Sequence, residues 1–483
     1  MHRLFEARGG GKSDSLMVTV LRCLHYEPPE PSMDGHMLIQ NASLVLPNRI
    51  VLGDLRVASG SIQTVAEGGG LSPSDGEVTI DATGLHLIPG AIDPHVHFRE
   101  PGHPEKEDLG SGSRAAAAGG VTAFLDMPNN IPNATNRETL AKKIALADKK
   151  AVTHHGFFIG ATKDNVSDLQ SVEGMDGVCG IKIFMGSSTG DLLVHEQSHL
   201  DDIFANTGGI IATHAEDEAR LQQRIAEFGH RTDIASHAEC RDVECAFLAT
   251  KRAAALAKDH EHRLHIVHLT SAKEADWLEK NKGELITTEV CTQHLTFDQD
   301  DVEELGERIL MNPPIRYTED KETLWKRLKD GTIDCVVTDH APHTLEAKSA
   351  GYPNAPAGMP GVETSLPLML THAMDGICSI NDVVEWMCAG PAKVYGMQKK
   401  GSLTEGYDGD LALVDLQTRR TITDGDTWTK VGWTPYSGME LTGWPIYTIV
   451  DGNVVHRREV NGPLRGESVA KAGSVGRALK FRV

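Results

Sequence analysis

The chain has 483 residues, of which 68 are acidic and 47 basic, so its formal net charge at neutral pH is −21. A chain of this length can bury a large core, and the excess of negative charge opposes nonspecific binding to nucleic acid or to an anionic membrane surface. No stretch approaches the roughly 18 to 20 consecutive apolar residues that a membrane-spanning helix needs. We therefore expect a small molecule as the partner, and neither nucleic acid nor a membrane.

Residues 1–36 show little periodicity and contain the glycines 9–11 and the proline-rich stretch 28–31. This composition predicts a disordered leader, and the change of pattern at Met37 would suit an original start of translation. A secretory signal peptide is disfavoured, because the apolar stretch 16–21 is short and no small-residue cleavage site is evident.

From Met37 onward the sequence contains short β-type runs, at 38–42, 50–57 and 62–65, and a similar texture returns at 410–415 and 448–455. Alternation of this kind predicts strands. The eight cysteines are scattered singly, without a Cys-x-x-Cys pair. That spacing is typical of free thiols in a reducing cytoplasm, where we expect the protein to reside.

Between about residues 88 and 396, strand-like apolar runs alternate with helix-like stretches such as 113–119, 139–149 and 243–258. The apolar runs end near His97, Asp126, Gly160, Phe184, His214, His268, Glu289 and Asp339. Eight such units predict an α/β fold of the (β/α)8 barrel type, in which catalytic residues lie at the carboxyl ends of the strands.

His95 and His97 directly follow the apolar run 87–92. Because side chains two residues apart on a strand project from the same face, both imidazoles can reach one cation. A pair of core histidines is the alternative, but the flanking Asp93 and Arg99 favour metal ligation.

Three further strand ends carry side chains of the ligand type, namely His214, His268 and Asp339. An acidic residue after a buried strand is costly unless it is paired, caps a helix or binds a metal. His265 lies three positions before His268, so we expect it on the opposite strand face in a structural role.

Lys182 interrupts the apolar strand 180–186, where a lone buried ammonium would be expensive. It either extends to solvent, pairs with an aspartate, or takes up CO2 to form a carbamate that bridges two cations. Four histidines, one aspartate and a carboxylated lysine suit two Zn²⁺ ions. Two close metals lower the pKa of a shared water and polarise a carbonyl, so the sequence predicts metal-assisted hydrolysis or its reverse.

The chain resembles the dihydroorotase family of the amidohydrolase superfamily over roughly residues 37–460. The resemblance rests on the motif DPHVHFREPG at 93–102 and on TDHAPH at 338–343. It implies a TIM-like hydrolase barrel at 91–396 and a smaller composite β-sandwich domain formed from 37–90 and 397–460. The sequence indicates no role for the tail, 461–483.

The resemblance also implies two zinc ions per subunit, bridged by carboxylated Lys182 and a hydroxide. Their other ligands would be the side chains at the strand ends: His95, His97, His214, His268 and Asp339. Asp339 would in addition act as the general acid and base, taking the proton of the hydroxide and passing it to the leaving nitrogen.

The substrate that the resemblance implies is N-carbamoyl-L-aspartate or its cyclic product L-dihydroorotate, in the biosynthesis of pyrimidines. Arg99 offers a planar fork for bidentate pairing with the substrate carboxylate. Asn129 and His343 match family positions that join Arg99, with Asn130 as an alternative register for Asn129. Asn312, in the segment NPPIR, matches an asparagine that contacts the pyrimidine ring.

Two alternatives stay open. A hydantoinase, dihydropyrimidinase or allantoinase acts on a ring without a carboxylate, and the joint presence of Arg99, Asn129 and His343 favours a dihydroorotase instead. A noncatalytic scaffold for aspartate transcarbamoylase would be expected to lack metal ligands, and all six are present. The family implies a homodimer or a larger assembly, and association with a transcarbamoylase is compatible with activity.

Overall fold

The computed structural model of the chain describes residues 36–187 and 192–482. The leader expected at 1–36 therefore lies outside the described residues, except for its last position. No helix in the described ranges is long and apolar enough to cross a membrane.

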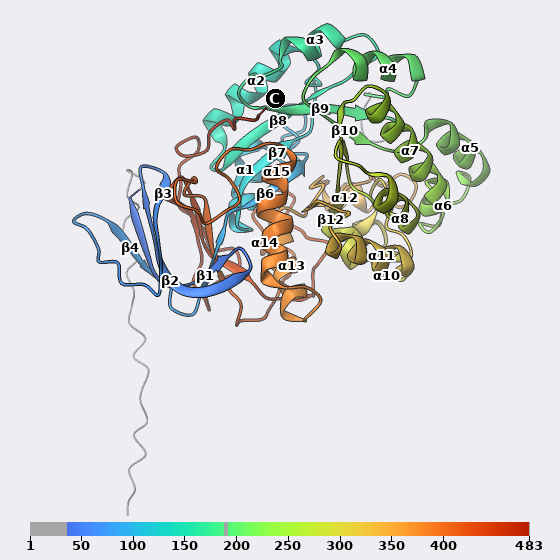
Figure 1. The fold of residues 1–483 in the computed structure, drawn as a ribbon. Helices are drawn as coiled ribbons and strands as arrows, with labels where there is room; N and C mark the ends of the chain where they lie inside the picture. The colour runs from blue at the N-terminus through green and yellow to red at the C-terminus, as the bar shows by residue number, and fades with distance from the viewer. Residues whose placement is uncertain (1–35, 188–191, 483) are drawn as a thin grey trace, which may run out of the picture. The chain divides into compact units, whose positions relative to one another are not determined.

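Eight parallel strands form one sheet in the order β13-β12-β11-β10-β9-β8-β7-β6 (Figure 1). They are β6 (Ala91–Val96), β7 (Val121–Asp126), β8 (His154–Gly160), β9 (Val178–Phe184), β10 (Ile210–His214), β11 (Arg263–Ile266), β12 (Ile286–Cys291) and β13 (Cys335–Val337). The amide of His97 donates to the carbonyl of His340 over 2.8 Å, which joins the two edges. The predicted barrel is confirmed, and each strand ends within two residues of the position expected from the sequence.

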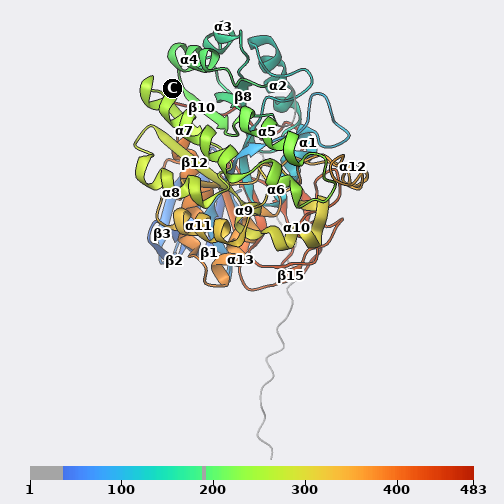
Figure 2. The same cartoon turned by 90° about the vertical axis from the view of Figure 1, so that its right-hand side faces the viewer.

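Helices surround this sheet, and Figure 2 shows α5 to α8 on the outer side of the barrel. The helices are α1 (Leu109–Ala118), α2 (Arg137–Lys150), α3 (Val166–Ser171), α4 (Gln197–Asn206), α5 (Glu218–Phe228), α6 (Ser236–Cys240), α7 (Val243–Asp259), α8 (Ala272–Asn281), α9 (Thr292–Thr296), α10 (Gln299–Leu305), α11 (Thr318–Lys329), α12 (Leu345–Lys348), α13 (Ser365–Met374), α14 (Ile380–Val384) and α15 (Gly390–Val394). Capping side chains fix where helices begin. At the start of α1, for example, the carboxylate of Asp108 accepts from the amides of Gly110 and Ser111.

Both faces of the barrel strands are buried, which explains why the strands read as continuous apolar runs. On β7, Phe124 packs in the cluster between the strands and the helices. Its neighbours Ala123 and Leu125 belong instead to the cluster that includes Cys291 and Val337 of other strands. This alternation fixes which side chains at the strand ends turn into the barrel.

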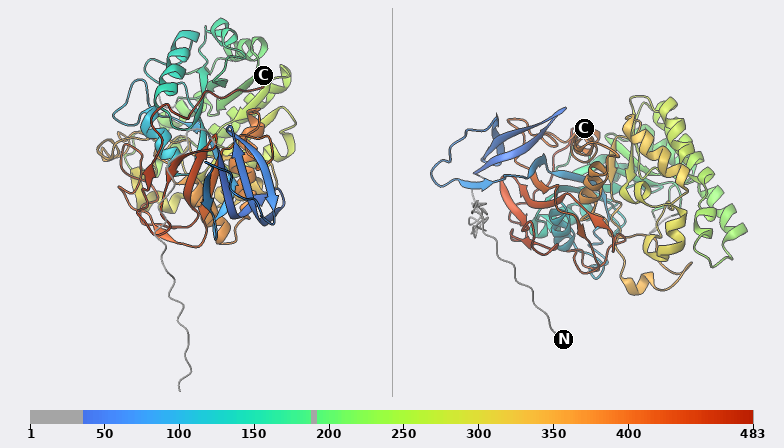
Figure 3. Two further views of the ribbon diagram at one scale, coloured as in Figure 1. Left: turned by 90° about the vertical axis from the view of Figure 1, so that its left-hand side faces the viewer. Right: turned by 90° about the horizontal axis from the view of Figure 1, so that it is seen from below.

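A second, nine-stranded sheet combines the two ends of the chain, and Figure 3 shows the blue and red strands side by side. Its strands are β1 (Met37–Leu46), β2 (Arg49–Ala58), β3 (Ser61–Glu67), β4 (Val78–Asp81), β5 (His86–Pro89), β14 (Leu411–Asp415), β17 (Trp444–Val450), β18 (Asn453–Arg457) and β19 (Glu467–Ser468). The ends meet where Leu87 of β5 pairs with Leu413 of β14. A bulge between Ile39 and Ala42 interrupts β1, which pairs with β4 before it and with β5 after it. The main sheet of the smaller β domain is therefore built from both ends of the chain, and residues from both ends share its core.

The tail beyond residue 460 lies against the barrel. The amide of His155 in β8 donates to the carbonyl of Arg477 over 3.1 Å, and the amide of Leu479 donates back to His155 over 2.9 Å. Gly177, just before β9, donates to Leu479 over 2.8 Å. The tail thus extends the hydrogen bonding of the barrel beside two of its strands.

Candidate metal centre and active site

Most of the side chains selected from the sequence lie at or just beyond the carboxyl ends of the barrel strands, while Lys182 lies within β9 and Asn312 in the loop before α11. One pocket there is lined by His95, His97, Arg99, Asn129, His214, His268, Asn312, Asp339, Ala341, Ala357 and Gly358. Two predicted residues, Lys182 and His343, do not line this pocket. Both are buried, and His343 contacts Arg99 beside it.

His95, His97 and Asp339 form a compact group whose ligand-type atoms all lie within 4.8 Å of one another. Oδ1 of Asp339 is 3.0 Å from Nε2 of His97 and 3.4 Å from Nε2 of His95. Burial alone would raise the pKa of Asp339, but the two histidines hold it below its ordinary value. Asp339 also has a φ of +47°, a strained backbone conformation of the kind found at functional sites.

His214 and His268 form a second pair, with Nδ1 of His214 2.9 Å from Nε2 of His268. Nε2 of His214 donates to Glu216 over 2.8 Å, so its Nδ1 keeps a lone pair on the side of His268. Burial lowers the pKa of both rings. Neutral imidazoles with converging nitrogens are suited to hold a cation between them.

Lys182 on β9 is 1% exposed, and its Nζ has no hydrogen-bond partner. Burial lowers its pKa to about 8, against the opposing effect of Glu289 and Asp339. The amine therefore neither extends to solvent nor pairs with an aspartate. A buried polar atom left without a partner calls for an explanation, and a bridging role toward cations would supply one.

Two buried glutamates complete this arrangement, and neither was selected from the sequence as a site residue. Oε1 of Glu289 lies 2.5 Å from Nδ1 of His95, and Glu216 accepts from His214 as described. The guanidinium of Arg241 pairs with Glu216 and, with His214, lowers its pKa to about 2 despite burial. An acidic residue at an inward position of β12 was a usable signal for Glu289.

The expectation for His265 was wrong in its geometry. Oε2 of Glu289 accepts from Nε2 of His265 over 2.9 Å, while Oε1 accepts from the amide of His268 over 3.2 Å. Because β11 ends at Ile266 and His268 has a φ of +40°, strand alternation does not extend to residue 268. His265 therefore lies inside the barrel, in contact with the carboxylate that holds His95.

Of the remaining predicted residues, Arg99, Asn129 and Asn312 line the pocket, and His343 contacts Arg99 beside it. Nη2 of Arg99 lies 3.2 Å from Nε2 of His343, and Nε donates to the carbonyl of Pro342 over 3.3 Å. Burial lowers the pKa of Arg99 to about 10, which leaves it charged at neutral pH. Burial and the adjacent Arg99 lower the pKa of His343 to about 2, so its ring is neutral.

The two asparagines of the pocket are held through their carbonyl oxygens. Asn129 accepts from Nδ1 of His97 over 2.7 Å, which leaves Nε2 of His97 as the nitrogen that faces Asp339. Asn312 accepts from Nε2 of His237 over 2.9 Å. Asn130, the alternative register, instead donates to the carbonyl of Glu100 over 3.1 Å. Asn129 is thus the member of this pair that lines the pocket.

Comparison with known proteins gives a consistent result. The model of the amidohydrolase family matches residues 86–455. The chain is 33% identical over 449 residues to a dihydroorotase of Methanosarcina acetivorans, covering 90% of this chain and 95% of that protein. It is 33% identical over 422 residues to an allantoinase of Streptomyces avermitilis, covering 85% and 93% respectively.

Solved structures resemble the chain over most of its length. The L-hydantoinase (dihydropyrimidinase) from Arthrobacter aurescens superposes with a TM-score of 0.86 at 28% identity, covering 92% of this chain and 99% of that one. A dihydropyrimidinase from Brevibacillus agri superposes with a TM-score of 0.81 at 27% identity, covering 92% and 98%.

Proposed function

The chain belongs to the amidohydrolase family, and from that premise we propose that it is a dihydroorotase, which reversibly cyclises N-carbamoyl-L-aspartate to L-dihydroorotate in pyrimidine biosynthesis. It is a metal-dependent cyclic amidohydrolase, and several archaeal relatives are dihydroorotases at 32% to 36% identity. The assignment of dihydroorotate, rather than another cyclic amide, as the substrate rests on Arg99, a buried cation that lines the same pocket as the candidate metal ligands.

Arg99 is suited to bind the carboxylate of the substrate. It is 7% exposed, and no aspartate or glutamate among the described residues forms an ion pair with it. A buried guanidinium without an anionic partner is costly, and a bound carboxylate would satisfy it through two parallel hydrogen bonds. The neutral His343 beside it adds a polar group without competing charge.

The donor set fits two zinc ions, one at His95, His97 and Asp339 and the other at His214 and His268. Lys182 would bridge them after carboxylation: its neutral Nζ forms a bond to the carbon of CO2, and the nitrogen releases one proton. Two zinc ions held there would lower the pKa of a shared water and polarise the carbonyl that it attacks.

Asp339 would move the proton. Its low pKa keeps it ionised at neutral pH, so it can accept a proton from the attacking water when the ring amide is opened. The C–N bond of that amide then breaks, and Asp339 returns the proton to the ring nitrogen that leaves. Ring closure is the reverse of these steps.

Two other activities remain as candidates. Hydantoin, dihydrouracil and allantoin carry no ring carboxylate, so an enzyme specific for them would leave Arg99 without an anionic partner. A noncatalytic scaffold for a transcarbamoylase has no need of metal ligands, whereas five of the six selected ligand residues are buried here and the sixth, His97, is partly buried. The observation that favours a dihydroorotase is therefore Arg99 at the metal site.

A panel of substrates tests this proposal. Zinc-loaded protein is incubated in parallel with L-dihydroorotate, hydantoin, dihydrouracil and allantoin, and ring opening is measured by chromatography. We expect L-dihydroorotate to be turned over fastest. Turnover of dihydrouracil or allantoin without turnover of L-dihydroorotate would overturn the assignment.

We also propose a cytoplasmic homodimer that can associate with aspartate transcarbamoylase. All seven cysteines among the described residues are free, which suits a reducing compartment. Light scattering of the purified protein, alone and mixed with the transcarbamoylase, measures both assemblies. A strictly monomeric protein would contradict the homodimer. Masses that do not change on mixing would contradict the association with the transcarbamoylase.

A further inference from the structure

A long loop of the smaller domain packs against the segment that follows the catalytic Asp339. We call residues 424–436, between β15 (Arg420–Thr421) and β16 (Glu440–Leu441), the 424–436 loop. Its Trp433 and Tyr436 are fully buried. The guanidinium of Arg308 bonds to Asp424 over 2.7 Å and lies 4.9 Å from the ring centre of Trp433. Long loops without secondary structure are uncommon in compact domains, and they frequently serve function.

Trp433 contacts the substrate side of the site directly. Its Nε1 donates to the carbonyl of His343 over 2.8 Å. The ring of His343 lies 3.2 Å from Nη2 of Arg99, which in turn donates through Nε to the carbonyl of Pro342. Trp433 therefore holds the backbone of one residue proposed to face the substrate carboxylate.

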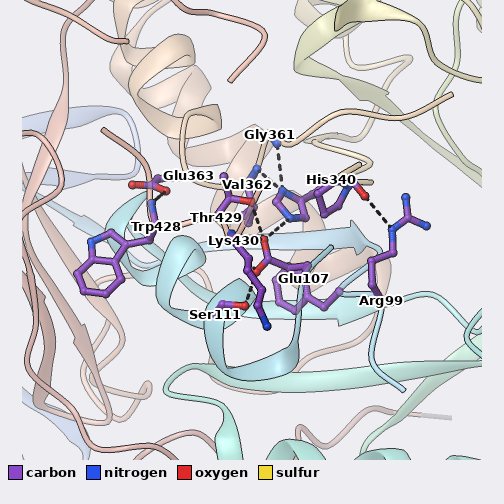
Figure 4. Close-up of polar contacts among 12 residues, drawn as sticks. Arg99, Glu107, Ser111, His340, Gly361, Val362, Glu363, Trp428, Thr429 and Lys430 are labelled. Atoms are coloured by element: carbon purple, nitrogen blue, oxygen red, sulfur yellow. Dashed lines mark hydrogen bonds and ion pairs between the residues drawn. The ribbon is translucent and has the colours of Figure 1, made fainter. Parts of the chain in front are cut away.

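The same loop is held a second time by the fully buried carboxylate of Glu107 (Figure 4). Oε2 of Glu107 accepts from the hydroxyl of Thr429 over 2.5 Å and from the amide of Lys430 over 3.1 Å. The hydroxyl of Ser111 in α1 donates to Oε1. Oε2 also lies 3.6 Å from Nε2 of His340, the residue after Asp339.

The orientation of His340 is fixed on its other side. Nδ1 accepts from the amides of Gly361 over 3.1 Å and Val362 over 3.3 Å, so the ring proton is on Nε2, toward Glu107 (Figure 4). Glu363, which follows Val362 in the chain, also binds the loop: its carboxylate accepts from the amide of Trp428 over 2.6 Å. The loop thus bonds directly to His343, and the Glu107 carboxylate that it binds lies against His340 at the start of the segment 340–343.

We propose that the 424–436 loop is a positioning element for substrate recognition: Trp433 bonds to the backbone of His343, and the carboxylate of Glu107, itself bound by the loop, faces the ring of His340 at 3.6 Å. The inference rests on the proposed function, because its consequence is a fixed placement of His343 and Arg99 toward the substrate carboxylate. Neither Trp433 nor Glu107 touches the reacting atoms, so a change at either should affect binding of the carboxylated ring rather than the chemical step.

Two matched substitutions in the same loop test this role. Trp433→Phe removes the indole N–H that donates to the carbonyl of His343. Trp428→Phe removes an indole N–H that donates to the carbonyl of Arg465 over 2.5 Å, away from the pocket. Loss of one such bond should raise the KM for L-dihydroorotate about three- to tenfold in the Trp433 variant, with kcat and zinc content near wild type. The Trp428 variant should keep the wild-type KM.

A second readout separates positioning from folding. The affinity of the zinc-loaded protein for orotate, a carboxylated pyrimidine, is measured by calorimetry, together with the melting temperature. If Trp433→Phe does not fold, benzothienylalanine at position 433 keeps the size of the indole and removes only its N–H. We expect weaker orotate binding in either Trp433 variant, without a matching loss in the Trp428 variant.

The outcomes distinguish the two proposals. Absence of turnover of L-dihydroorotate by the wild type would overturn the proposed function and, with it, this inference. Normal turnover by the wild type, with unchanged KM and unchanged orotate affinity in the Trp433 variants, would overturn the loop's positioning role alone. An equal effect of the Trp428 substitution would also contradict it, because that indole bonds outside the pocket.

Discussion

Oε1 of Glu289 lies 2.5 Å from Nδ1 of His95, on a carboxylate that is completely buried inside the barrel. Since Nδ1 donates to this oxygen, Nε2 of His95 is left as the atom that faces Asp339. A residue on β12 therefore determines which nitrogen of a β6 residue is available to a metal.

Replacing Glu289 by glutamine should weaken zinc binding about 10- to 100-fold, because a neutral amide holds the imidazole less firmly. The measurement is zinc affinity by competition with a chelator. Glu274→Gln is the matched control: Glu274 is equally buried but accepts from Thr250 and Ser271, away from the pocket. Equal zinc affinity of the Glu289 variant and the wild type would contradict this role.

Lys182→Ala should lose most bound zinc and most activity, because the proposed bridge between the cations is removed. Short carboxylic acids should partly restore both, since they can occupy the place of the carbamate. Metal analysis after dialysis measures the loss. Lys400→Ala is the control, because it breaks a buried ion pair with Asp410 in the smaller domain. Added carboxylic acids should not change its zinc content or activity. Full zinc occupancy of the Lys182 variant would rule out the bridge.

Arg99→Met should leave the zinc content unchanged and raise the KM for L-dihydroorotate about 10- to 100-fold, as expected for the loss of charge-assisted hydrogen bonds. Steady-state kinetics and metal analysis on one preparation test both parts. Arg49→Met is the comparison and should keep the wild-type KM, because Arg49 pairs with Glu67 in the smaller domain and does not line the pocket. A wild-type KM in the Arg99 variant would remove the main argument for a carboxylated substrate.

His372 on α13 should contribute to acid destabilisation. Burial lowers its pKa from the ordinary 6.5 to about 4, so the unfolded chain binds this proton more readily than the folded one. The associated stability is present above pH 6.5 and is lost as the pH falls toward 4. Urea unfolding of the wild type and of His372→Gln across this range should show the shallower pH dependence in the variant. Parallel curves would contradict the assignment.

Much of the site could be predicted because it depends on local pattern. His95 and His97 are two residues apart at the end of an apolar run, and a barrel places all such ends at one face. Lys182 was notable because a cation interrupts a buried strand. These inferences need only the sequence near each residue and the rule for parallel strands.

The contacts that could not be predicted join residues far apart in the chain. Glu289 is 194 positions from His95, and Trp433 is 90 positions from His343. Nothing near either residue in the sequence identifies its partner, because that pairing is set by the tertiary packing. The error at His265 has a local cause: β11 ends at Ile266, and the alternation of strand side chains was extended two residues beyond it, to His268.

The most direct test of carboxylate recognition by Arg99 compares L-dihydroorotate with dihydrouracil as substrates of the zinc-loaded wild type and of Arg99→Met. The two rings differ in the carboxylate, so the ratio of their kcat/KM values measures its recognition. We expect a strong preference for L-dihydroorotate in the wild type and a much smaller one in the variant. Equal or faster turnover of dihydrouracil by the wild type would contradict it.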